Sequence, residues 1–70
     1  MNFLWEYAKV VELKDIDLAK RLSVSRAHIS ALRLDKSTPS PRFMVNVAKV
    51  FPDLRPKVLV WFEEQTRKEA

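Results

Sequence analysis

The stretch LAKRLSVSRAHISAL, residues 18–32, decides the fold of this chain. Its apolar side chains recur at helical spacing on both sides of a short polar break, with Leu18 and Leu22 before it and Ile29 and Leu32 after it. Ala19 is small at the place where two helix axes must come close. The pattern predicts two short helices that cross around a tight turn.

Polar residues at the ends of these two helices predict where they begin. Asp15 and Asp17 suit the positive end of a helix dipole, so the first helix is expected over residues 15–22. Ser25 is a good N-cap, so the second is expected over residues 26–34. The face of the second helix that points away from this contact begins with a basic residue and otherwise carries small side chains.

Three further helices flank this pair. Residues 3–13 carry an apolar stripe at positions 4, 7, 8 and 11, with Asn2 as the expected cap. After the loop DKSTPS at residues 35–40, Ser40 and Pro41 begin a helix that ends before Pro52. Asp53 is expected to cap the last helix, over residues 54–68. The sequence therefore predicts an all-α fold of five short helices in one domain, residues 1–70.

Composition excludes several kinds of function. The 70 residues include no cysteine and one histidine, so we expect no disulfide, no metal site and no cofactor. There is no glycine-rich phosphate loop, and no histidine–carboxylate spacing that favours an enzyme. No apolar run is long enough to span a membrane, and the N-terminal residues do not resemble a signal peptide. We expect a cytoplasmic, nucleoid-associated protein.

Positive charge is concentrated in the middle of the chain. The net charge is +4, but residues 20–57 contain nine basic and two acidic side chains. A concentrated basic surface suits a polyanion such as nucleic acid, although a merely solvated surface is an alternative on charge alone.

The spacing of core and cap residues resembles the lambda-repressor-like helix-turn-helix family, also called the XRE or Cro/C1-type family. The resemblance covers about residues 4–54. It is densest at Leu18-Ala19, Leu22, Val24-Ser25, Ile29-Ser30 and Leu32, and it continues at Pro39-Ser40 and Ala48. It implies a DNA-binding domain whose helix-turn-helix is residues 15–34 and whose third helix lies in the major groove.

The chain departs from this family at several positions. Ser23 and Asp35 stand where relatives usually have glycine, so left-handed backbone is expected at both. Ala8 and Arg33 replace an arginine–glutamate ion pair of the family, which leaves Arg33 free for solvent, Glu12 or a phosphate. Asp15 stands where relatives often have glutamine, and its carboxylate would repel a phosphate.

The resemblance implies that the third helix reads bases. Arg26 is expected to contact a guanine or the adjacent phosphate, and Ser30 to donate a hydrogen bond. Ala27 and Ala31 offer methyl contacts to thymine, unless they serve only as good helix formers. His28 flanks this face as a further base contact, or else is a partly buried side chain. The predicted base contacts are Arg26, Ala27, His28, Ser30 and Ala31.

Phosphate contacts are expected on either side of the third helix. Ser25 presents the N-terminal N–H groups of that helix, and Arg42 lies early in the fourth helix. The full set is Lys14, Ser25, Lys36, Ser37, Thr38 and Arg42.

Some apolar residues near the two ends exceed what a small core can hide, so we predict a homodimer interface. Its expected members are Trp5, Leu59, Val60 and Trp61. The alternative is that Trp5 and Trp61 pack on each other within one subunit.

The functional hypothesis is a small repressor of phage or mobile-element type. Its dimer would bind two half-sites of double-stranded DNA and occlude the operator. The alternatives are an antitoxin or another module that binds a partner protein, and an accessory factor for recombination. The tail EEQTRKEA is short for a segment that wraps a toxin.

Overall fold

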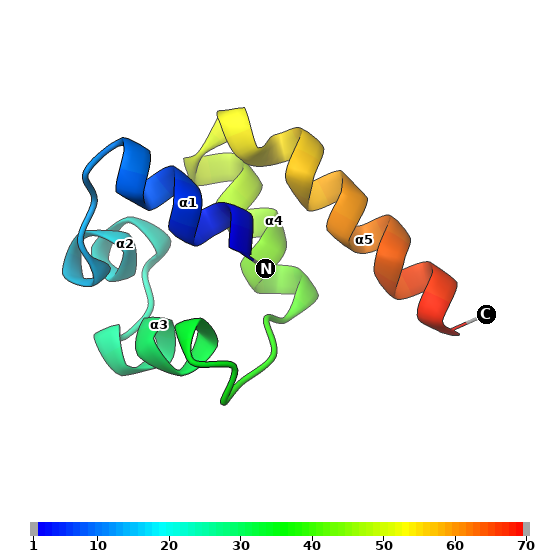
Figure 1. Ribbon diagram of the computed structural model, residues 1–70, viewed down its shortest axis with the longest axis horizontal. Helices are drawn as coiled ribbons and strands as arrows, with labels where there is room; N and C mark the ends of the chain where they lie inside the picture. The colour runs from blue at the N-terminus through cyan, green and yellow to red at the C-terminus, as the bar shows by residue number, and fades with distance from the viewer. Residues whose placement is uncertain (1, 70) are drawn as a thin grey trace.

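The computed structural model describes the backbone of residues 2–69 and the side chains of residues 2–67. Over this range the chain is all-α, with five α-helices and no strand, as the sequence predicts (Figure 1). The helices are α1 (Asn2–Val10), α2 (Asp15–Leu22), α3 (Arg26–Arg33), α4 (Pro41–Val50) and α5 (Arg55–Glu69), and a 3₁₀ turn, η1 (Pro52–Leu54), precedes α5.

One core joins the helices, and it is built from the predicted apolar stripes. Leu4, Leu18, Leu22 and Ile29 are fully or almost fully buried, together with Met44 of α4. Each helix from α1 to α4 therefore buries one stripe of apolar side chains that recur at helical spacing. The other buried members are Ala8, Ala19, Leu32, Phe43, Val47, Phe51, Leu54 and Val58.

A three-residue turn connects α2 to α3. Ser23 has φ 56° and ψ 42°, the left-handed conformation expected from its place in the sequence. The Val24 N–H then donates to the Ala19 carbonyl at 3.0 Å. At the far side of the turn, the Ser25 hydroxyl accepts from the His28 N–H at 3.0 Å and caps α3. Both predicted features of this turn are confirmed.

The same C-terminal motif ends three helices without any glycine. Asp35 follows α3 with φ 57°, as expected, and Glu12 follows α1 with φ 59°. At all three ends, an N–H group bonds to the carbonyl of an alanine five residues earlier, the pattern of a Schellman motif. These bonds run from Leu13 to Ala8, from Val24 to Ala19 and from Lys36 to Ala31.

The first helix is shorter than the sequence predicts, and the left-handed backbone of Glu12 explains why. α1 ends at Val10 and not at residue 13, because the motif reverses the chain there. Val10 and Val11 are consequently exposed and do not extend the apolar stripe. Asn2 is the first residue of α1, whereas the sequence predicts it directly before the helix as a cap.

The start of the last helix also differs from the prediction. Asp53 lies within the 3₁₀ turn, and α5 begins at Arg55. The inner face of α5 consists of Val58, which is buried, and of Trp61, Phe62 and Gln65, which are partly buried. The end of α5 extends away from the other helices (Figure 1). Within the described residues, no helix is both long and apolar enough to cross a bilayer.

Candidate nucleic-acid interface

One face of α3 is exposed and nearly free of large side chains. Arg26, Ala27 and Ser30 are exposed and Ala31 is partly buried, whereas Ile29 and Leu32 turn into the core. Leu34, directly after the helix, is 60% exposed. We call Arg26, Ala27, Ser30, Ala31 and Leu34 the α3 face. It presents one cation, one hydroxyl and otherwise small or apolar surface.

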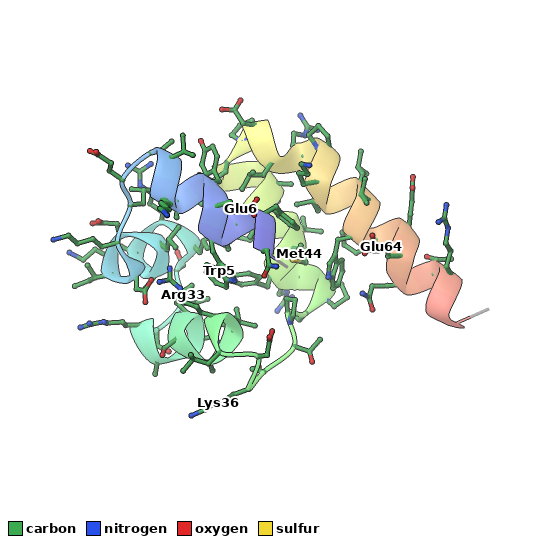
Figure 2. The ribbon with its side chains drawn as sticks, in the orientation of Figure 1. Trp5, Glu6, Arg33, Lys36, Met44 and Glu64 are labelled. Atoms are coloured by element: carbon green, nitrogen blue, oxygen red, sulfur yellow. The ribbon has the colours of Figure 1, made fainter. Side chains whose placement is uncertain are left out.

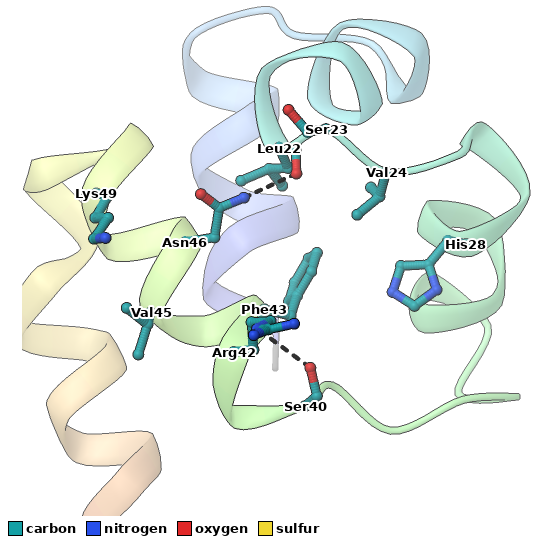
Figure 3. A pocket seen from close by; sticks show the side chains of 10 residues that line it. All are labelled: Leu22, Ser23, Val24, His28, Ser40, Arg42, Phe43, Val45, Asn46 and Lys49. Atoms are coloured by element: carbon teal, nitrogen blue, oxygen red, sulfur yellow. Dashed lines mark hydrogen bonds between the residues drawn. The ribbon is translucent and has the colours of Figure 1, made fainter.

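His28 does not lie on this face. Its ring is partly buried and packs edge-on against Phe43 of α4, with 5.7 Å between the centroids. Figure 3 shows the ring turned toward the space between α3 and α4. Of the two sequence interpretations of His28, this packing favours the partly buried side chain over the base contact.

A groove of about 650 Å³ runs between the α2–α3 turn and α4 (Figure 3). Two exposed cations, Arg42 and Lys49, lie on its α4 side, and Ser23 and His28 lie across from them. The groove therefore brings positive charge from α4 next to the helix pair at the centre of the fold.

Asn46, also in this groove, holds α4 against the end of α2. Its Nδ2 donates to the Leu22 carbonyl at 2.8 Å, which satisfies one of the acceptors left open where α2 ends. We did not predict this contact from the sequence. The sequence shows only an amide side chain between the apolar positions Met44 and Val47. It does not identify the partner carbonyl, which lies 24 residues away.

The expected phosphate contacts lie on both sides of α3 along the chain. Lys14 precedes α2 and Ser25 caps α3, while Arg42 lies in the first turn of α4 after the Ser40 cap. The loop between α3 and α4 contributes Lys36, Ser37 and Thr38, and the Lys36 side chain extends away from the bundle (Figure 2). All six are exposed except Ser37, which is partly buried.

Arg33 is not free, contrary to the sequence prediction. Its guanidinium forms an ion pair with Asp15 at 2.6 Å and lies over the Trp5 ring, 5.1 Å from the centroid (Figure 2). It therefore connects α1, α2 and α3. The crossing of α2 and α3 creates this contact, which explains why sequence spacing did not reveal it.

The predicted dimer residues divide into two groups. Leu59 and Val60 on α5 are 64% and 50% exposed. Trp5 and Trp61 are partly buried against the core, which leaves part of each side chain exposed. The alternative, a pair of tryptophans, is not observed: among the described side chains, Trp5 contacts Arg33 and Trp61 packs edge-on against Phe62.

The described residues contain no cluster of three or more histidine, cysteine or acidic side chains that could hold a metal ion. No family model matches the chain, and no curated protein or solved structure has significant similarity to it.

Proposed function

We propose that this protein binds double-stranded DNA sequence-specifically, with residues 15–34 as a helix-turn-helix of the lambda-repressor-like type. The α3 face carries the proposal. A major groove about 12 Å wide admits an α-helix, and small side chains at Ala27 and Ser30 allow close approach to the bases. The left-handed turn at Ser23 and the capped start of α3 support this interpretation.

In this arrangement Arg26 is the principal polar base contact. A guanidinium donates to the two acceptors of a guanine, which is the commonest specific contact in the major groove. Ser30 donates a single hydrogen bond, and Ala27 and Ala31 meet thymine methyl groups. Because few polar groups take part, the shape of the DNA contributes to specificity.

Basic and capping residues around α3 hold the DNA backbone. Arg42 and Lys36 approach phosphates on one side of the helix, and Lys14 does so from the start of α2. The ion pair with Arg33 offsets the negative charge of Asp15, so its repulsion of a phosphate is weaker than the sequence predicts.

The biological role that fits is a small transcriptional regulator that represses by occluding an operator. Two copies on half-sites about one helical turn apart would block access to the promoter. The exposed apolar residues Leu59 and Val60 favour a second candidate, a module that binds another protein on the same scaffold.

Selection from random duplex DNA, followed by a salt titration, distinguishes the two candidates. We expect an enriched motif, and an affinity that falls with log salt at a slope of about −0.9 per phosphate contact. The matched control is Lys57→Ala, which removes an exposed cation of α5 that is not part of the α3 face. Absence of both a motif and a salt dependence rejects DNA binding and leaves the protein-binding module.

A further inference from the structure

Two side chains of α4, Val45 and Lys49, form a ridge between two hollows in the protein surface. On one side is the groove of Figure 3, and on the other is a hollow of about 480 Å³ between α4 and α5. Val45 and Lys49 line both hollows, and the Val45 side chain extends from α4 toward α5 (Figure 3). The ridge and its two hollows therefore form one continuous surface, which we call the α4 surface.

The charge of the α4 surface has a single sign. The charged side chains that line it are Arg42, Lys49 and Arg55, and among the described residues no aspartate or glutamate lines either hollow. All three cations are exposed. The ion pair found among the described side chains joins Arg33 to Asp15 and uses none of them. Charge complementarity therefore requires a ligand that carries negative charge.

The lining between these cations is apolar, which distinguishes the α4 surface from a site for phosphates alone. Val24 and Phe43 line the groove of Figure 3, and Ala48 and Phe62 line the hollow beside α5. Val45, on the ridge, is 45% exposed. A nucleic-acid backbone has no large apolar groups to fill such hollows, whereas an amphipathic helix presents apolar and charged side chains together. The lining therefore favours a protein segment over a nucleic acid.

An occupant that fills both hollows must cross the ridge. A helix with its side chains is about 10–12 Å wide, so the hollows beside α4 require two anchors about that far apart. In a helix that rises about 1.5 Å per residue, apolar side chains about seven residues apart have this spacing and lie on one face. Residues midway between the anchors then face Lys49 on the ridge.

We infer that the α4 surface binds an acidic amphipathic helix of a partner protein, with two apolar anchors about seven residues apart and carboxylates between them. One anchor enters the groove of Figure 3, the other enters the hollow beside α5, and the carboxylates pair with Lys49. Arg42 borders the first hollow and Arg55 the second. This interaction goes beyond DNA binding and does not depend on it, and it gives the protein-binding candidate a surface and a partner chemistry.

The probe is a displayed library of random peptides about 16 residues long, enough for both anchors, selected on the purified 70-residue chain. We expect the enriched peptides to be acidic, with apolar residues about seven positions apart. A labelled peptide from this set should bind with a Kd of about 10–100 μM by fluorescence anisotropy, because one helix on an open surface makes a small interface. The same peptide with amides in place of its carboxylates should bind about tenfold more weakly.

Charge reversals locate the peptide on the protein. Lys49→Glu and Arg55→Glu should each weaken binding about tenfold, because each places a like charge next to the carboxylates of the peptide. The matched controls are Arg26→Glu on the α3 face and Lys57→Glu on α5 outside both hollows, and both should leave the Kd within about twofold of wild type. Far-ultraviolet circular dichroism confirms that each variant is folded, and Lys49→Gln with Arg55→Gln replaces the reversals if one is not.

Three outcomes overturn the inference. The first is a selection that enriches no peptide, or only peptides without acidic residues. The second is a peptide whose binding is weakened by Arg26→Glu and not by Lys49→Glu, since it would lie on the α3 face. The third comes from sedimentation equilibrium without peptide: a wild-type dimer that Lys49→Glu dissociates would assign the α4 surface to a second copy.

Failure of this inference and failure of DNA binding can be told apart by measuring both ligands on the same variants. A chain that binds its selected duplex but no acidic peptide would leave the DNA proposal standing and overturn the partner helix. A chain that binds the peptide with the expected loss in Lys49→Glu, but binds no DNA, would retain the α4 surface and reject the proposed DNA function.

Discussion

Asp15 and Arg33, the first residue of α2 and the last residue of α3, form an ion pair with 2.6 Å between Oδ1 and Nη2. The pair joins the two helices that hold the α3 face, and Trp5 of α1 lies beneath the guanidinium. Because the side chains are 42% and 27% exposed, solvent screens the attraction. The ion pair therefore acts mainly by holding α3 in its orientation relative to α2.

Arg33→Ala should lower the free energy of unfolding by about 1–2 kcal/mol, because it removes both the ion pair and the contact with Trp5. Urea denaturation measures the change. Arg33→Lys is the control, since it retains the charge but not the planar group, and it should lose less. A double-mutant cycle with Asp15→Ala tests the pair itself, and strictly additive effects would contradict the coupling.

Arg26→Ala should weaken binding to the selected DNA by about 1–3 kcal/mol and relax specificity at one base position. The guanidinium of Arg26 is exposed on the α3 face, where it reaches the base edges in the proposed complex. Competition binding with singly substituted duplexes measures the change. Equal weakening on every duplex would assign Arg26 to a phosphate instead.

Arg42→Ala should weaken binding to all DNA sequences alike and reduce the salt slope by about one. Arg42 lies in the first turn of α4, beside the Ser40 cap and in the groove of Figure 3. Fluorescence anisotropy at several salt concentrations measures the slope, with Lys57→Ala as the matched loss of one cation. An unchanged slope removes Arg42 from the set of phosphate contacts.

Ser23→Gly should stabilise the protein by about 0.5–1 kcal/mol, because glycine relieves the left-handed strain at φ 56°. The greater conformational freedom of glycine in the unfolded chain offsets part of this gain. Thermal unfolding measures the gain. Ser25→Ala, two residues away, should have the opposite effect, a loss of about 1 kcal/mol, because it removes the cap of α3. A destabilised Ser23→Gly variant would show that the turn is not strained.

Asn46→Ala should destabilise the fold by about 1 kcal/mol, because the Leu22 carbonyl loses its side-chain donor. Asn46→Asp keeps the size but replaces the amide donor with a carboxylate next to the negative end of α2, so its loss should be larger. Urea denaturation compares both variants with wild type. Equal stability of Asn46→Asp and wild type would mean that the hydrogen bond contributes nothing.

Local features of this fold were predictable because they depend on neighbours along the chain. Ser25 and Ser40 act as caps, and Ser23 and Asp35 take left-handed backbone, all as the sequence predicts. The prediction was wrong at Glu12, because nothing in the residue type marks glutamate as a left-handed position. The exposed α3 face also follows from helical spacing once Ile29 and Leu32 are placed inward.

The sequence by itself determined which residues turn inward and where most helices begin, since amphipathic spacing and capping operate over three or four residues. Only the tertiary structure decided that Arg33 is paired, that Asn46 closes the end of α2 and that His28 packs on Phe43. These contacts join residues 15–24 positions apart on different helices. They depend on the angle and distance at which two helices pack, and the whole core sets both.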